Sequence, residues 1–73
     1  MKISYATKED QLHIILADSP ILETAEVVEG LFFDYDAAGN VVAVEIEHPL
    51  ERLHLPAVAR QDLTRALERA TKR

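Results

Sequence analysis

The residues of this 73-residue chain that could do chemistry are an acidic stretch, three histidines and two serines. The stretch runs from Asp34 to Glu45 and matches positions one, three, six and twelve of a calcium-binding loop. Position five is Ala38, which has no side-chain oxygen, and position nine is Val42, which the apolar pattern places in a core. Strand-like alternation flanks the stretch, where a calcium loop of this kind needs helices. The stretch therefore favours a β-hairpin.

The same stretch has a second interpretation, a weaker cation site of another kind. Asp34 and Asp36 are two residues apart, so both would point outward on one face of a strand. Together with Glu26 and Glu45 they make an acidic outer face. The binding of a small ligand or a divalent cation by this face is the alternative function.

The histidines and serines do not have the spacing of a metal or catalytic site. His48 and His54 are six residues apart, whereas two ligands on one helix face need three or four. His13 alternates with apolar residues, which places it on the outer face of a strand. Ser4 and Ser19 lie in a predicted strand and turn without a glycine-rich elbow, and the chain has no cysteine. We therefore expect a non-enzymatic protein with no cofactor, metal site or catalytic residue.

Composition and charge limit the class of protein. Hydrophobic residues make up 48% and charged residues 29%, as in a single small domain over 1–73. With no apolar run of roughly 18 residues and no signal peptide, we expect a soluble, cytoplasmic protein without membrane contact. The net charge is −8 over residues 1–49 and +3 over 50–73. The acidic part argues against nucleic acid, and basic residues near a helix C-terminus fit the helix dipole.

Alternating apolar residues over 1–48 predict an antiparallel sheet built from hairpins. Directly opposed residues share a face, so the apolar positions set the register. The first hairpin, with a four-residue loop at 7–10, pairs Tyr5 with Leu12 and Ile3 with Ile14.

Residues 23–36 have two interpretations. A three-residue turn at 28–30 would place Gly30 at its left-handed position and pair Val27 with Leu31 and Ala25 with Phe33. One long bent strand would keep the same parity.

A last hairpin has a four-residue loop at 37–40, in which Gly39 is expected to adopt a positive φ. Its register opposes Tyr35 to Val42, Phe33 to Val44 and Leu31 to Ile46. The predicted centre of the core is Leu31, Phe33, Val44 and Ile46.

After Pro49 the chain is rich in helix formers. Residues 50–53 predict one helical turn, and an apolar stripe from about Ala57 onward predicts an amphipathic helix. In the simplest arrangement this helix covers the apolar face of the sheet. The predicted fold class is α+β: a small antiparallel sheet over 1–48 followed by a helical tail over 50–73.

Apolar residues on the outer face predict self-association. If Leu31 and Phe33 point inward, Phe32 points outward and is surrounded by acids, which suggests a contact surface. A small core without disulfides also favours an oligomer, and we expect a two-fold homodimer with the basic tail near the partner's acids. The predicted interface residues are Phe32, Ile15, Val41, Ala43, Arg65 and Arg69, and Val28 shares their face.

Residues 1–46 also resemble a small bacterial family catalogued as domain of unknown function 2283. The likeness rests on Ile3-x-Tyr5, on Asp10-x-Leu12-x-Ile14-x-Leu16 and on the pattern from Gly30 to Ile46. Ala6, His13 and Ala43 depart from the family pattern. The resemblance implies no established activity, but it implies an antitoxin-like role beside a basic partner protein encoded nearby. We therefore interpret the chain as a self-associating protein-interaction module.

Overall fold

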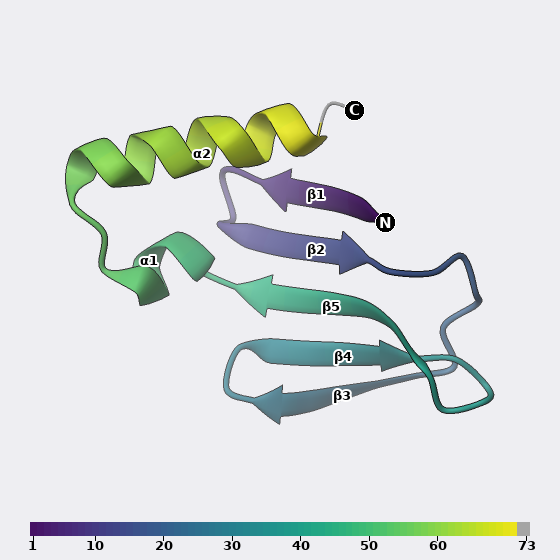
Figure 1. The fold of residues 1–73 in the computed structure, drawn as a ribbon. Helices are drawn as coiled ribbons and strands as arrows, with labels where there is room; N and C mark the ends of the chain where they lie inside the picture. Colours follow the sequence, from purple (N-terminus) through teal and green to yellow (C-terminus); the bar gives the residue numbers. More distant parts are fainter. Residues whose placement is uncertain (72–73) are drawn as a thin grey trace.

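The computed structural model describes residues 1–71 and contains an antiparallel sheet followed by two helices (Figure 1). The strand order in the five-stranded sheet is β1-β2-β5-β4-β3. The strands are β1 (Lys2–Ala6), β2 (Gln11–Ile15), β3 (Glu23–Val28), β4 (Leu31–Tyr35) and β5 (Val41–Glu47), and the helices are α1 (Pro49–Leu53) and α2 (Ala57–Thr71). The predicted α+β class is confirmed. Lys72 and Arg73, part of the predicted helical tail, lie outside the described residues.

The predicted pairing of the first hairpin is confirmed, with Tyr5 opposite Leu12 and Ile3 opposite Ile14. The connection from β2 to β3 crosses to the far edge of the sheet, and β5 returns to lie between β2 and β4. One apolar row therefore crosses the sheet, and it consists of Ile3, Ile14, Val44, Phe33 and Ala25.

A β-bulge corrects the predicted register between β3 and β4. Ala25 lies opposite Phe33 as predicted, but Val28, and not Val27, lies opposite Leu31. The turn therefore has two residues, and the extra residue is Val27 inside the strand. Gly30 has the expected left-handed conformation, with φ 80°.

A second bulge corrects the register between β4 and β5. Tyr35 lies opposite Val41 while Asp34 lies opposite Ala43, so Val42 is the extra residue and the predicted Tyr35–Val42 pair is wrong. The Val42 carbonyl accepts hydrogen bonds from the backbone N–H groups of residues 16 and 17 at 2.8 and 3.2 Å. Because opposed residues share a face, the two bulges move Val28 and Val41 onto the face of Leu31 and Tyr35.

The bulges make the two sheet faces chemically distinct. The register defines an apolar face, which consists of Ile3, Tyr5, Leu12, Ile14, Ala25, Val28, Leu31, Phe33, Tyr35, Val41, Val44 and Ile46, and which also holds Glu23 opposite Tyr35. The outer face consists of Lys2, Ser4, Ala6, Gln11, His13, Ile15, Thr24, Glu26, Phe32, Asp34, Ala43, Glu45 and Glu47. Nearly all polar side chains of the sheet are therefore on one side.

The loop between β4 and β5 is closed by Asp36. Its Oδ1 accepts hydrogen bonds from the backbone N–H groups of Ala38 and Asn40 at 3.0 and 2.9 Å. The hydrogen bonds from Asn40 and its neighbours lower the pKa of Asp36. The Asp36 carboxylate therefore serves as the hydrogen-bond acceptor of its own loop.

Gly39 in this loop has φ 85°, and apart from its chain neighbours no atom of the described residues 1–71 lies within 4 Å of a Cβ atom built on it. Any cost of a side chain there is therefore a backbone cost. We expect Gly39→Val to lower the free energy of unfolding by about 1–2 kcal/mol, because a β-branched residue is strained at positive φ. Ala38→Val, its exposed neighbour, should change stability by less than about 0.5 kcal/mol. Urea melts compare the two variants, and equal losses would contradict this assignment.

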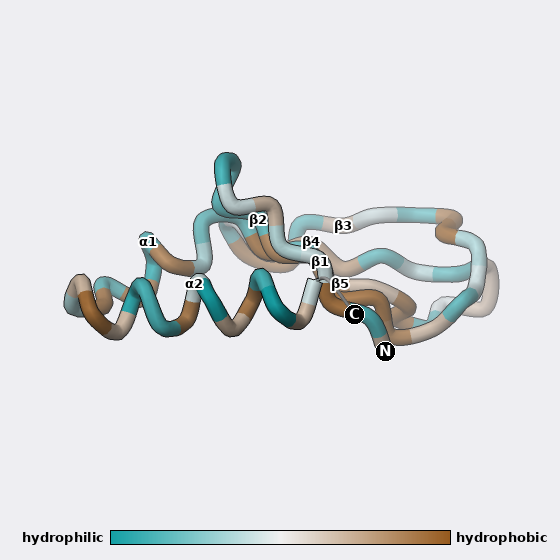
Figure 2. Tube along the Cα trace, turned by 90° about the horizontal axis from the view of Figure 1, so that it is seen from above, coloured by the Kyte–Doolittle hydropathy of each residue, from teal (hydrophilic) through white to brown (hydrophobic). Residues whose placement is uncertain are grey.

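Helix α2 lies along the β1 edge of the sheet, whereas the apolar stripe had predicted that it covers the apolar face (Figure 1). The Tyr5 backbone N–H donates to Thr71 Oγ1 at 2.7 Å, and Thr7 Oγ1 donates to Glu68 Oε2 at 2.9 Å. Seen from above, α2 lies over this edge, and no second layer covers the strands within residues 1–71 (Figure 2). Strand β1 fits this contact because its outer backbone groups have no neighbouring strand.

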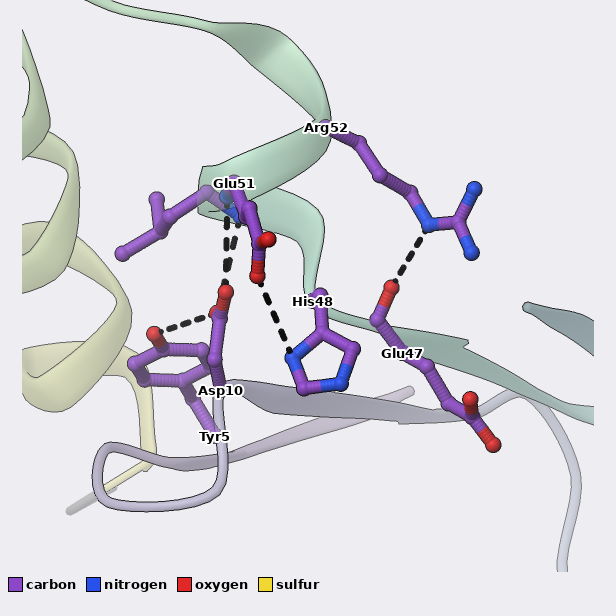
Figure 3. Close-up of polar contacts among 7 residues, drawn as sticks. Tyr5, Asp10, Glu47, His48, Glu51 and Arg52 are labelled. Atoms are coloured by element: carbon purple, nitrogen blue, oxygen red, sulfur yellow. Dashed lines mark hydrogen bonds and ion pairs between the residues drawn. The ribbon is translucent and has the colours of Figure 1, made fainter.

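Asp10 fastens the short helix α1 to the first hairpin (Figure 3). Its carboxylate accepts the Tyr5 hydroxyl at 2.7 Å and lies 3.5 and 3.4 Å from the backbone N–H groups of Leu50 and Glu51. The His48 N–H donates to the Asp10 carbonyl. The Leu50 side chain, next to these hydrogen bonds, is buried.

Candidate functional site

The apolar face is the first candidate site, because the chain leaves it partly open. The buried hydrophobic residues among 1–71 are Tyr5, Val42, Ala43 and Leu50. The predicted core centre, Leu31, Phe33, Val44 and Ile46, is only half-buried. Val28 on this face is 59% exposed. Four buried apolar side chains are few for a domain of this size, so the face lacks a covering layer.

The overall dimensions agree with a missing layer. The molecule measures 42 × 28 × 16 Å, and its radius of gyration is 13.2 Å, against about 11 Å for a compact chain of this length. Its accessible surface is 5320 Å², whereas a folded monomer of this mass exposes about 4,500 Å². The excess is about 800 Å², which is the area that one partner buries in an interface of standard size.

The residues predicted to form an interface lie in three different places of one copy of the chain. Phe32 and Ile15 lie half-buried on the outer face, as expected. Ala43 is only 2% exposed, because the connection between β2 and β3 runs beside it, and the second bulge places Val41 on the apolar face. Arg65 and Arg69 are exposed on α2, and Arg65 lies 3.9 Å from Asp62.

The outer face instead carries a cluster of polar side chains from three neighbouring strands. His13 on β2 lies opposite Glu45 on β5, and Asp34 lies on β4. Candidate ligand atoms of the three residues all lie within 4.8 Å of one another, and His13 Nε2 is 3.7 Å from Asp34 Oδ2. We call these three residues the His–Asp–Glu cluster.

Asp34 is the most deeply placed member, with 1% of its surface exposed. Thr24 Oγ1 donates to its Oδ1 at 2.6 Å, whereas its Oδ2 and His13 Nε2 have no hydrogen-bond partner among residues 1–71. A protonated Glu45 can donate to Asp34, and this hydrogen bond, followed by burial, raises the pKa of Glu45. When Glu45 is ionised, two carboxylates face each other beside an unsatisfied buried oxygen, which is a costly arrangement.

An open hollow of about 410 Å³ gives access to the His–Asp–Glu cluster. Its lining includes Ser4, His13, Thr24, Phe32 and Glu45. The alternation of His13 with apolar residues predicts its place on the outer face but points to no role for it. His13 and Glu45 are far apart in the sequence. They lie opposite each other because β2 pairs with β5.

A second group of titratable side chains, Asp10, His48 and Glu51, lies at the N-terminus of α1 (Figure 3). This group is more exposed than the His–Asp–Glu cluster, and His48 Nδ1 is 3.8 Å from a carboxylate oxygen of Glu51. The Asp10 carboxylate is occupied by the Tyr5 hydroxyl and two backbone N–H groups. This group therefore serves to hold α1 in place.

Comparison with known proteins gave one match. Residues 2–48 match the family described as Protein of unknown function (DUF2283). The match covers the whole sheet and stops before α1. No curated protein and no solved structure matches the chain. Among residues 1–71, no helix is both long and apolar enough to cross a membrane.

Proposed function

The chain belongs to the DUF2283 family of proteins of unknown function, and from that premise we propose that it is a non-enzymatic interaction module that self-associates through its apolar face. The uncovered apolar face carries this proposal. Its central residues, Phe33, Val44 and Ile46, are half-buried in one copy of the chain. A layer that buries them would complete a hydrophobic core of ordinary thickness.

A second copy of the chain is the occupant that fits best. The accessible surface of the chain exceeds that of a folded monomer of this mass by about 800 Å², which is enough for one side of a standard dimer interface. Two apolar faces are complementary to each other without any charged partner, and a two-fold axis brings the same patch of both copies together. Glu23, opposite Tyr35, lies at the margin of this face.

The charge distribution also favours this face over the outer one. Glu26, Asp34, Glu45 and Glu47 lie on the outer face, so pairing two outer faces would bring like charges together. Pairing the apolar faces keeps these acids on opposite sides of the dimer. Each outer face would then be free to contact a basic protein.

Sedimentation equilibrium tests the proposal with two matched variants. Phe32 and Phe33 are neighbours on β4, both half-buried, and they point to opposite faces. We expect a dimer at micromolar concentration for the wild type and for Phe32→Glu, and a monomer for Phe33→Glu. A monomeric wild type, or dissociation by Phe32→Glu alone, would overturn the assignment.

A second measurement does not depend on the folding of a variant. In a mixture of isotope-labelled and unlabelled wild-type chains, NMR contacts between chains should involve the side chains of Leu31, Phe33, Val44 and Ile46. Contacts between chains that involve Phe32 and Ile15 instead would move the interface to the outer face.

A further inference from the structure

We propose that the His–Asp–Glu cluster binds one divalent transition-metal ion, with Zn²⁺ as the best fit. The site lies on the outer face, so it goes beyond the self-association proposed above and is independent of it. Three adjacent strands supply the three ligands: His13 from β2, Glu45 from β5 and Asp34 from β4. Because sheet pairing fixes all three backbones, the three side chains start from adjacent positions before any ion binds.

The distances suit a small cation. Zn²⁺ binds imidazole nitrogen and carboxylate oxygen at about 2.1 Å, so two ligands of a tetrahedral site are roughly 3.4 Å apart. The observed distance from His13 Nε2 to Asp34 Oδ2 is 3.7 Å, and the third ligand atom lies within 4.8 Å of both. Small rotations of the Glu45 side chain would bring its carboxylate into range.

Asp34 gives an independent indication that a ligand belongs here. Asp34 is 1% exposed, and its Oδ2 lies 3.7 Å from His13 Nε2. Within the described part of the chain, neither atom has a hydrogen-bond partner. Burying an unpaired polar atom is costly, and a cation between the two atoms would satisfy both. The Thr24 hydroxyl holds Oδ1 at 2.6 Å and so orients the carboxylate, as residues behind metal ligands do.

The donor set selects the class of metal. One imidazole with two carboxylates suits Zn²⁺ and related transition ions, whereas Mg²⁺ and Ca²⁺ prefer oxygen ligands throughout. Three protein ligands leave a fourth position of a tetrahedral ion free. The hollow lined by Ser4 and Phe32 gives that position access to solvent.

Isothermal titration with ZnCl₂ tests the site. We expect one ion per wild-type chain, and at least tenfold weaker binding for His13→Gln and for Asp34→Asn. The matched control is His48→Gln, because His48 also lies near a carboxylate, 3.8 Å away, but on the surface at α1. It should bind as the wild type does, and equal concentrations of MgCl₂ or CaCl₂ should give no comparable heat.

Glu45→Gln separates a metal ligand from a structural residue. Without metal, this variant should raise the melting temperature, because an amide can donate to Asp34 Oδ2 and the facing charge is removed. With ZnCl₂, it should show a smaller stabilisation than the wild type. A residue kept only for stability would lower the melting temperature when replaced.

Imidazole nitrogen resonances give a readout on the wild-type protein alone. Equimolar ZnCl₂ should shift the Nε2 resonance of His13 and leave those of His48 and His54 in place. The proposal is overturned if His13 does not shift, or if His48→Gln abolishes binding while His13→Gln retains it. A monomeric Phe33→Glu that keeps its sheet should still bind one ion, so failure of the dimer and failure of the metal site can be told apart.

Discussion

Phe33→Ala should lower the free energy of unfolding by about 3–5 kcal/mol, the cost of truncating a fully buried aromatic residue. Phe33 lies in the middle of the apolar row between Ala25 and Val44, and its ring packs edge-on against Tyr35 with centroids 6.4 Å apart. A single copy buries it only in part. The full cost therefore requires the second copy to cover the ring.

Urea unfolding at two protein concentrations measures this effect. The stability of a dimer rises with protein concentration, so the wild-type midpoint should rise as well, and Phe33→Ala should weaken that dependence. Phe32→Ala is the control on the opposite face and should cost much less. A loss below about 1 kcal/mol for Phe33→Ala would mean that its ring stays uncovered. For a domain of this size, a loss of 3–5 kcal/mol is comparable to the whole stability.

Asp10→Ala should lower the free energy of unfolding by about 2–3 kcal/mol, although Asp10 is only half-buried. The variant removes the acceptor for the Tyr5 hydroxyl and for the first backbone N–H groups of α1. Tyr5 is 6% exposed, so its hydroxyl would lose its partner in a buried place. Asp10→Asn is the matched control, because asparagine keeps an acceptor oxygen and tolerates the φ of 50° found here.

The same variant should change the alkaline limit of stability. Burial, followed by the hydrogen bond to Asp10 and its charge, raises the pKa of Tyr5 from 10.0 to about 12. A raised pKa in the folded state means that the contribution is complete below pH about 10 and is lost as the pH rises toward 12. Asp10→Ala should lower this pKa in a titration followed by tyrosinate absorbance. An unchanged Tyr5 titration would contradict the role assigned to Asp10.

The sheet could be predicted from the sequence where turn length and parity agree. The four-residue loop of the first hairpin leaves one register that puts Ile3, Tyr5, Leu12 and Ile14 on one face, and the structure has that register. The bulges could not be predicted in this way. An extra residue inside β3 changes parity as an extra residue in the turn does, so the pattern around Val27 fits both.

The His–Asp–Glu cluster and the position of α2 depend on contacts that no local pattern determines. His13 and Glu45 meet only because β5 returns to pair with β2, and that strand order is a property of the whole sheet. The stripe on α2 shows that the helix must pack on something. The stripe does not show whether the helix packs on a face or on an edge of the sheet, because both arrangements would cover Leu63 and Leu67.

The position of α2 limits which edge of the sheet can pair with another copy of the chain. The helix shields the β1 edge, where Thr71 Oγ1 takes the Tyr5 N–H that a further strand would otherwise use. The opposite edge strand, β3, is exposed along its whole length. The negative charges of Glu23 and Glu26 would repel a second β3 strand that approached this edge. Proteolysis between α1 and α2 would release the helix and uncover β1. An exposed apolar face beside an unpaired strand edge is the kind of surface on which fibrils grow, so we expect removal of α2 to favour polymerisation.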